Sequence, residues 1–380
     1  WWAGLHAAPS MPDGAGTEGA AADGNGNAFP ATLFPVQQEG FSRWRTILEE
    51  SLSRGRFNLL RAPFPGPGPC RQLLRGRIAA RQYDEPGRLI KVSATADLNP
   101  FFTCPALWFY QKILGLKPFS LEAQLLDDAS LGLLYHEILK NLFLEIREQD
   151  GCFRSAHIAA YRSRLVRITA QAARQYRAFQ GPLAVPLLVS QSAAIVKRLT
   201  VLLKTEAKYF DGYAVGVLEQ RLCLEQDGML LNGIIDRVSV SPGNEAVIID
   251  YKTGGSHSKK AGTETEDGGL RDFQIPLYIK LYEEQGGLKT AGACFMLINK
   301  HDISAVVGSP GKKRGHSRDE YQETLDALEE KLGQFRRSVE ELDFAPRTFS
   351  LKDCLDCDYK TLCRTSFFLN APAQEAAHVR

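Results

Sequence analysis

The chain has 380 residues, of which 44% are hydrophobic and 24% charged, proportions that are typical of soluble globular proteins. This length suits two or three domains or one elaborated domain. The formal net charge is +2, which excludes a uniformly basic nucleic-acid-binding protein and leaves only a local basic patch for that role. No apolar run approaches the ~20 residues that span a bilayer, and no signal peptide is recognisable.

Eight cysteines in a chain without secretion signals indicate a reducing compartment, and we therefore expect a cytoplasmic protein. In that setting some of the cysteines are better candidates for metal ligands than for disulfides. The first residue is tryptophan rather than methionine, which we interpret as a sign that the chain is a piece of a longer protein.

Residues 8–28 are rich in glycine and alanine and are acidic, which predicts a flexible loop or linker. A helix is predicted over residues 40–54, and the proline-rich residues 62–68 interrupt the chain again. Residues 70–90 include Arg71, Arg75, Arg77 and Arg81, which we interpret as a solvated helix face rather than a DNA contact. The sequence contains no GxxxxGK[ST] phosphate-binding loop, so this chain carries no ATP-driven motor of its own.

Residues 93–118 begin with a serine/threonine helix-start signal and continue as an aromatic-rich helix that contains Cys104 and Pro105. Such an aromatic stripe is most often part of a hydrophobic core. Residues 130–147 place apolar side chains at helical spacing and predict an amphipathic helix. His136 lies at the edge of its apolar stripe, where a histidine taken by itself is more often structural than a metal ligand.

Residues 153–210 predict a largely helical, arginine-bearing segment. Its basic residues could line a DNA channel, although an exposed charged face is the default interpretation. Residues 214–226 alternate like a β-strand, and Glu219 lies on that strand. Strand-edge polarity is the favoured interpretation of Glu219.

Residues 229–252 predict two strands joined by the turn Ser-Pro-Gly-Asn. Asp236 and Asp250 interrupt the apolar strand runs, and a buried carboxylate is costly unless it is paired or binds a metal. Asp250 and Lys252 are two residues apart, so on a strand they point to the same face. The pattern fits a divalent-metal phosphodiesterase site, and a surface salt bridge on an ordinary hairpin fits it equally well.

A helix is predicted from Asp272 to about Gln285, in which Pro276 is tolerated because it falls in the first turn. Gln274 and Tyr278 are four residues apart and share one face of this helix. Farther along, the sequence predicts a buried strand over 291–299, a basic loop over 303–318 and a charged amphipathic helix over 319–341.

Three cysteines near the C-terminus, Cys354, Cys357 and Cys363, have a spacing that allows their thiolates to face one centre. A fourth ligand must come from elsewhere, and Cys104 is the natural candidate. A four-cysteine set suits either a [4Fe–4S] cluster or a structural zinc ion. Spacing alone slightly favours zinc.

The motifs GIIDRV at 233–238 and VIIDYKTG at 247–254 resemble motifs II and III of the PD-(D/E)XK nuclease superfamily, in its RecB-like branch. The G-x-x-x-H-E pattern at 132–137 resembles motif I, and QIPLY at 274–278 resembles the QxxxY motif. The Cys-Pro pair and LGLKP within 93–118 resemble the segment that opens the nuclease domain of AddB-type helicase–nuclease subunits. The family's proline-aspartate pair is Ile235-Asp236 here.

This resemblance implies an α/β fold with a restriction-endonuclease-like core, in which helices flank a central mixed sheet. It further implies a long helical insert and a cysteine-ligated cluster. The expected organisation is an N-terminal region at 1–92, which could be the remnant of an upstream helicase-like domain, a nuclease domain at 93–365 and a C-terminal tail at 366–380. The expected insert covers 153–210.

The resemblance also implies a set of site residues. The expected ligands of Mg²⁺ or Mn²⁺ are His136, Asp236, Asp250 and the carbonyl of Tyr251. Lys252 is expected to assist attack by water, and Gln274 and Tyr278 to position the substrate backbone or the lysine. In related nucleases an acid at the position of Glu219 can flank the metal. The expected ligands of a [4Fe–4S] cluster are Cys104, Cys354, Cys357 and Cys363, with zinc as the plain alternative.

The implied activity is that of a Mg²⁺-dependent deoxyribonuclease that acts on single-stranded DNA ends. A helicase–nuclease partner of AddA type would supply the ends during AddAB/RecBCD-like double-strand-break processing and recombination repair. One alternative is a non-catalytic DNA-binding or scaffold domain of such a complex, which the intact D…DxK set disfavours. Another is a Cas4-like nuclease of CRISPR adaptation, which the long helical insert disfavours.

Overall fold

The computed structural model describes residues 69–85, 87–117, 128–175, 184–253, 270, 272–310, 315–346 and 351–363. All of them belong to one of the two compact units of the chain, which spans Asn58–Arg380. The helix predicted over 40–54 and the linker predicted over 8–28 lie outside the described residues. None of the helices in the described part is long and apolar enough to cross a membrane.

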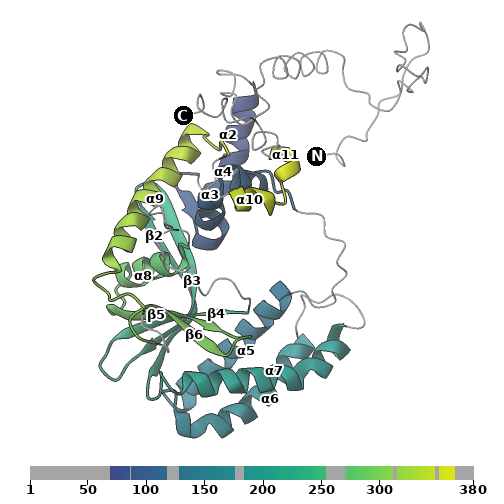
Figure 1. Cartoon of the computed structure of the whole chain (residues 1–380), viewed down its shortest axis with the longest axis vertical. Helices are drawn as coiled ribbons and strands as arrows, with labels where there is room; N and C mark the ends of the chain where they lie inside the picture. The colour runs from purple at the N-terminus through teal and green to yellow at the C-terminus, as the bar shows by residue number, and fades with distance from the viewer. Residues whose placement is uncertain are drawn as a thin grey trace, which may run out of the picture. The chain divides into compact units, whose positions relative to one another are not determined.

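A mixed six-stranded sheet lies at the centre of the described part of the chain, as the α/β prediction requires (Figure 1). Its strands are β1 (Ile90–Val92), β2 (Ala214–Gln226), β3 (Met229–Val240), β4 (Ala246–Lys252), β5 (Thr290–Leu297) and β6 (Asp302–Val307). The order is β1-β3-β4-β5-β6, with β2 paired to β3. The pairs β1–β3 and β4–β5 are parallel and the others antiparallel.

The β3–β4 hairpin forms where the sequence predicted it. Val240 pairs with Ala246, and the Asn244 N–H donates to the Ser241 carbonyl across the turn at 2.9 Å. Asn244 adopts a left-handed conformation with φ 61°, which asparagine tolerates better than most residues. One expectation was wrong in part: the basic loop predicted over 303–318 begins as strand β6, because Ile303, Val306 and Val307 bury their side chains.

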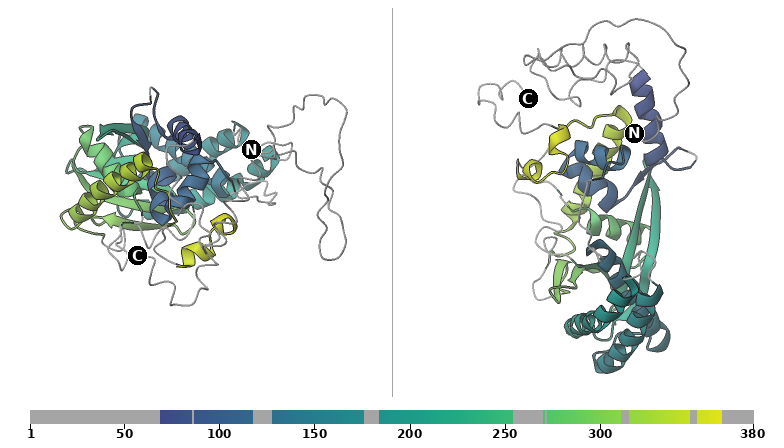
Figure 2. Two further views of the ribbon diagram at one scale, coloured as in Figure 1. Left: turned by 90° about the horizontal axis from the view of Figure 1, so that it is seen from above. Right: turned by 90° about the vertical axis from the view of Figure 1, so that its right-hand side faces the viewer.

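Helices cover both faces of the sheet (Figure 2). The longer ones are α2 (Pro69–Gln82), α5 (Asp128–Gln149), α6 (Ile158–Gln175), α7 (Ala184–Glu206), α8 (Gln274–Glu284) and α9 (Gln322–Glu341). The shorter helical segments are η1 (Ala94–Leu98), α3 (Asn99–Thr103), α4 (Pro105–Trp108), η2 (Phe109–Ile113), η3 (Ser155–His157), α10 (Leu351–Leu355) and α11 (Lys360–Cys363).

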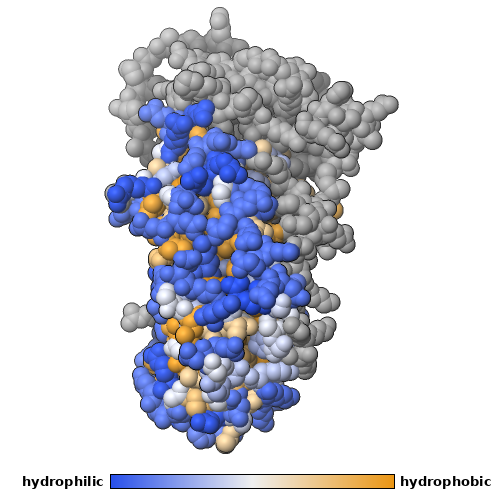
Figure 3. Space-filling model, turned by 90° about the vertical axis from the view of Figure 1, so that its left-hand side faces the viewer, coloured by the Kyte–Doolittle hydropathy of each residue, from blue (hydrophilic) through white to orange (hydrophobic). Residues whose placement is uncertain are grey.

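Each face of the sheet carries its own hydrophobic core. Helices α5, α6 and α7 pack on one face, through residues such as Leu139, Leu165 and Leu199. The segments α2 to η2, together with α8 and α9, pack on the other face. The insert predicted over 153–210 is therefore the helical pair α6–α7 together with η3, and it completes one of the two cores. Figure 3 shows the molecule from the α9 side, where hydrophilic residues dominate the described surface.

The aromatic stripe of residues 93–118 is part of a core, as predicted. The Trp108 ring is fully buried and meets Phe101 and Phe335 edge to face, with ring centroids 5.8 and 5.3 Å apart. Because burial of one large apolar side chain contributes about 1.5–3 kcal/mol, these rings fasten α3 and α4 to α9.

A buried carboxylate ties the first described segments together. Asp97 Oδ1 accepts from Gln82 Nε2 at 3.0 Å and Trp108 Nε1 at 3.3 Å, and it lies 3.2 Å from Lys112 Nζ. Its Oδ2 accepts from the Ser93 N–H at 2.9 Å and the Ser93 hydroxyl at 2.8 Å. Since both oxygens are so fully bonded, the desolvated charge is compensated, and α2, η1 and η2 are held to one another.

The C-terminal helices α10 and α11 return to the start of this region. The Tyr359 hydroxyl donates to the Leu116 carbonyl at 2.8 Å, and the rings of Tyr359 and Tyr110 lie 5.5 Å apart. The early and late cysteine-bearing segments are therefore neighbours in space.

Helix α8 approaches β3 closely because Gly233 has no side chain. A Cβ at position 233 would lie 2.9 Å from Tyr278 Cε1 and 3.1 Å from Leu281 Cδ1, both in the buried core. Only glycine therefore permits the observed distance between β3 and the helix that carries Gln274.

We expect Gly233→Ala to destabilise the fold by about 1–3 kcal/mol, because the added methyl group overpacks the α8–β3 contact. The measurement is urea unfolding followed by circular dichroism. Gly76→Ala in α2 is the matched control, since a Cβ there meets nothing within 4 Å and alanine raises helix propensity. Equal stability of the two variants would contradict this account of the α8–β3 contact.

Candidate functional site

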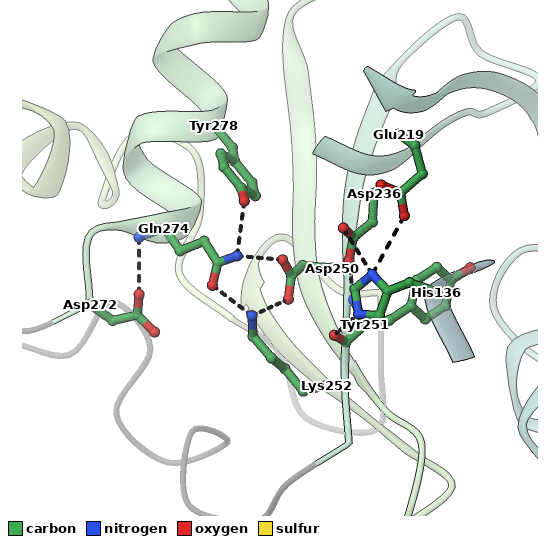
Figure 4. Close-up of polar contacts among 9 residues, drawn as sticks. All are labelled: His136, Glu219, Asp236, Asp250, Tyr251, Lys252, Asp272, Gln274 and Tyr278. Carbon is green, nitrogen blue, oxygen red and sulfur yellow. Dashed lines mark hydrogen bonds and ion pairs between the residues drawn. The ribbon is translucent and has the colours of Figure 1, made fainter. Parts of the chain in front are cut away.

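The predicted metal-binding and catalytic residues come from four elements and meet beside one end of β4 (Figure 4). Helix α5 supplies His136, β3 supplies Asp236, β4 supplies Asp250, Tyr251 and Lys252, and α8 supplies Gln274 and Tyr278. A further residue, Glu219, comes from β2. The side chains fall into two adjoining groups, one around His136 and one around Gln274.

The first group is a histidine between two acids. His136 Nδ1 lies 3.3 Å from Asp236 Oδ1 and 3.5 Å from Glu219 Oε1. One ligand atom from each of the three residues lies within 4.8 Å of the others. Two carboxylates and one imidazole are donors that suit Mg²⁺ or Mn²⁺, so the chemistry of these residues fits a divalent-metal site.

Glu219, for which strand-edge polarity was the favoured interpretation, lies beside His136. It follows an irregularity in the β2–β3 register between Val215 and Leu218. Its φ of 44° is unusual for a non-glycine residue in a strand. This backbone conformation turns the carboxylate toward His136, so strand alternation could not reveal it. Strained residues of this kind cluster at functional sites.

The two acids control the charge of the imidazole. Burial lowers the pKa of His136, but hydrogen bonds to Asp236 and Glu219 and the charge of Asp250 outweigh burial and raise the pKa to about 10. At neutral pH the metal-free site therefore holds an imidazolium between carboxylates, and a metal ion has to displace its proton.

The Tyr251 main chain joins the groups of this site. Its N–H donates to Asp236 Oδ2 at 2.8 Å, and its carbonyl oxygen lies 3.0 Å from His136 Nε2. A proton on Nε2 donates to that carbonyl and leaves Nδ1 facing the acids. In this arrangement the Tyr251 carbonyl orients the imidazole. A histidine that binds a metal through one ring nitrogen usually donates the other N–H to such an acceptor.

The second group contains Asp250, Lys252 and Gln274. Lys252 Nζ lies 2.8 Å from Asp250 Oδ2 and donates to Gln274 Oε1 at 2.7 Å. Gln274 Nε2 donates to Asp250 Oδ1 at 2.7 Å and to the Tyr278 hydroxyl at 2.9 Å. The side chains of Asp250 and Lys252 thus lie on the same face, as their spacing predicted, and Gln274 fixes both.

Asp250 is not among the three residues that gather around His136 Nδ1. It is almost fully buried, and burial and the neighbouring Asp236 charge raise its pKa to about 7, whereas Lys252 lowers it. The raised pKa means that the Asp250 carboxylate binds a proton more tightly than usual. A metal ion should be favoured for the same reason, because either cation relieves the repulsion between Asp250 and Asp236.

The four predicted cluster cysteines are half-buried thiols. Burial, together with smaller effects of the Cys363, Cys104 and Cys357 thiols, raises the pKa of Tyr110 to about 12. Burial also raises the pKa of Cys357; the Tyr359 N–H lowers it, and Cys104 and Cys354 raise it.

The predicted cysteine cluster is nevertheless not seen. Among the described residues no three cysteine sulfurs lie within 4.8 Å of one another. Two sulfurs bound to one zinc at ~2.3 Å can be at most ~4.6 Å apart, so this arrangement does not hold a closed zinc site. In a polynuclear iron–sulfur cluster the thiolates can bind different irons. Four cysteines can therefore hold such a cluster with their sulfurs farther apart than in a zinc site.

Comparison with known proteins identifies the family. The model of the PD-(D/E)XK nuclease superfamily matches residues 91–364. A curated protein from Treponema pallidum (strain Nichols), described only as uncharacterized, is 34% identical over 137 residues, which are 36% of this chain and 16% of that protein. The chain thus corresponds to a small part of the length of that relative.

A solved structure of a candidate exonuclease from Eubacterium rectale aligns with a TM-score of 0.36 at 16% identity, covering 78% of this chain and 95% of that chain. At this TM-score the likeness carries no argument about function.

We expect metal binding to release about one proton from His136 at pH 8.5, because its pKa is about 10 and that of Asp250, about 7, lies below this pH. Apparent affinity should therefore fall as the pH is lowered. The measurement is calorimetric titration with Mn²⁺ in two buffers of different ionisation enthalpy. The control is His136→Gln, in which this release should disappear. Heats that do not depend on the buffer in the wild-type protein would contradict the assignment.

Proposed function

This chain belongs to the PD-(D/E)XK nuclease superfamily, and from that premise we propose that it is a metal-dependent DNA nuclease that cleaves phosphodiester bonds. The observation that carries the proposal is the position of Lys252. Its ammonium group is held by Asp250 and Gln274, and its side chain is 21% exposed. A fixed, partly exposed cation beside acids that suit a divalent metal is the arrangement that phosphodiester hydrolysis requires.

In this proposal the metal is held by His136, Asp236 and Asp250, with Glu219 as a further acid. The Tyr251 carbonyl is the remaining candidate ligand, if its contact with the imidazole is exchanged for the metal. A bound Mg²⁺ or Mn²⁺ supplies Lewis-acid polarisation of the phosphate and of the attacking water. Lys252 orients that water and offsets negative charge that develops on the phosphate.

Gln274 and Tyr278 are positioning residues in this proposal. The Gln274 amide contacts Lys252 through its oxygen and Asp250 through its nitrogen, so it sets the lysine and the acid relative to each other. Tyr278 accepts the second N–H of that amide and packs against Gly233, which fixes the orientation of the amide.

For the substrate we propose single-stranded DNA ends, and for the partner a helicase–nuclease subunit of AddA type. The pathway would be AddAB/RecBCD-like double-strand-break processing and recombination repair. The support is the motif resemblance to AddB-type subunits. The small share of the Treponema pallidum relative that is matched is consistent with a module of a larger protein.

Two other functions compete with this proposal. A non-catalytic DNA-binding or scaffold domain would not need the Asp250–Lys252–Gln274 contacts. Forming them requires the Asp250 carboxylate to be buried, which is unfavourable in free energy. A Cas4-like nuclease would share the site, but the α6–α7 insert favours an AddB-type domain.

We also propose that Cys104, Cys354, Cys357 and Cys363 hold a [4Fe–4S] cluster. The support is that the early and late cysteine-bearing segments are in contact, through the Tyr359 hydroxyl with the Leu116 carbonyl and the Tyr359 ring with that of Tyr110. Such a cluster would link the two ends of the domain, and closing a loop of this length removes much conformational entropy from the unfolded chain.

We expect Lys252→Ala to lower the rate of DNA cleavage by about 100- to 1000-fold, the usual effect of removing one group that stabilises developing charge. Asp250→Ala should reduce the rate at least as strongly. The measurement is cleavage of end-labelled single-stranded DNA with Mg²⁺ or Mn²⁺, using strands labelled at either end to reveal polarity.

The matched control for that assay is Lys280→Ala on α8, because Lys280 pairs with Glu329 and is not among the site residues. This variant should cleave like the wild type. If wild type, Asp250→Ala and Lys252→Ala all cleave equally, the catalytic assignment is wrong and the scaffold function is favoured.

For the cluster, we expect anaerobically purified protein to contain about four irons and four sulfides per chain, with visible absorption that is lost in Cys104→Ser. The exposed Cys223 provides the control variant, Cys223→Ser, which should keep the iron. Iron-free protein that carries zinc would overturn the cluster proposal and would leave the nuclease proposal untouched.

A further inference from the structure

A buried ion pair lies behind the candidate metal site. Arg237 and Glu206 are 0% and 1% exposed, and Arg237 Nη2 donates to Glu206 Oε1. Arg237 follows Asp236 on β3, and Glu206 is the last residue of α7. The pair therefore links the site-bearing strand to the helical insert.

The pair is poorly suited to stabilise the core. Arg237 Nε and Nη1 and Glu206 Oε2 have no hydrogen-bond partner among the described residues. Desolvation of two charges is costly, and well-packed apolar residues in place of such a pair are often as stable or more stable. We therefore look for a role of the Arg237–Glu206 pair other than stabilising the fold, and the residues around Arg237 indicate what that role is.

The Arg237 guanidinium lies near two aromatic rings beside the candidate site, those of Phe143 and Tyr251. Its Cζ lies 3.8 Å from the centre of the Phe143 ring and 5.6 Å from that of the Tyr251 ring. Phe143 is on α5, seven residues after His136 and therefore close to the same helix face. The flat guanidinium thus contacts both the helix that carries His136 and the strand that carries Asp250.

Tyr251 connects this pair to the site. Its ring meets the His136 ring edge to face, with centroids 6.1 Å apart. Its N–H binds Asp236 and its carbonyl lies against His136 Nε2. Any rotation or shift of Tyr251 therefore moves the contacts of both residues at once.

We propose that Arg237, held by Glu206, is a positioning residue that fixes Tyr251 and Phe143 and thereby sets the distance between His136 and Asp236. The inference rests on the proposed function, because the distance it sets is that of the metal ligands. The Arg237 side chain is fully buried, so it acts through Tyr251 and α5.

The experiment compares Mn²⁺ binding by calorimetry and electron paramagnetic resonance, without DNA, in the whole protein. We expect Arg237→Met to weaken Mn²⁺ binding by about 10- to 100-fold, as is typical when a group that supports a metal ligand is lost. Cleavage should recover as the Mn²⁺ concentration is raised, with an unchanged maximal rate.

Arg164→Met is the matched control. Arg164 also pairs with an acid, Asp150, at 2.6 Å and lies over a ring, that of Tyr161, at 5.4 Å, within the same helical layer. It has no contact with Tyr251, so this variant should bind Mn²⁺ like the wild type even if it is less stable. Equal weakening in the two variants would overturn the proposal.

A double variant separates positioning from packing. Arg237→Met combined with Glu206→Met removes both buried charges, so it should unfold at a temperature similar to that of the wild type. If the pair positions Tyr251, the double variant still binds Mn²⁺ about tenfold more weakly. Recovery of wild-type affinity would show that the pair only packs the core.

Hydrogen exchange of the Tyr251 amide gives a readout that needs no metal. We expect it to exchange about tenfold faster in Arg237→Met and in the double variant, because its bond to Asp236 opens more often. An unchanged rate in both would overturn the proposal. A wild-type protein that binds no Mn²⁺ would instead refute the metal site, while the exchange rates still decide the role of Arg237.

Discussion

Repulsion between two buried carboxylates is the constraint on which this structure depends. Asp236 precedes Arg237 and Asp250 follows Ile249, and Arg237 and Ile249 form the β3–β4 pair farthest from the turn. Both acids are buried. A fold tolerates such a pair only if cations or donors reach each acid. The compensation for Asp236 is His136 and the Tyr251 N–H, and the compensation for Asp250 is Lys252 and Gln274. A divalent metal would relieve the same repulsion.

The two layers of helices provide these compensating groups from opposite faces of the sheet. Helix α5 brings His136 from the face covered by the insert, and α8 brings Gln274 from the other face. Both hydrophobic cores therefore contribute to the geometry of one site. The close contact of α8 with Gly233 and the Arg237 guanidinium between α5 and β4 are the points at which packing sets the positions of the polar groups.

Much of the architecture could be predicted, because strong periodic patterns survive in most tertiary contexts. The amphipathic helix over 130–147 corresponds to α5, and the predicted hairpin corresponds to β3 and β4. The short strand β1 and the strand β6 were not predicted. β1 is only three residues long and is held by pairing with β3, a long-range contact that no local pattern reveals.

The sequence by itself determined which residues could carry the chemistry. The contact of Asp250 with Lys252 follows from the period of a strand, and that of Gln274 with Tyr278 from the period of a helix. Only the tertiary structure decided that Glu219 joins His136 and that a buried Arg237 lies beneath Tyr251. Both depend on non-local events: an irregularity in the pairing of β2 with β3, and the packing of α7 and α5 on the sheet. Local sequence encodes the direction of a side chain along its own element, whereas convergence of elements is set by the packing of the whole core.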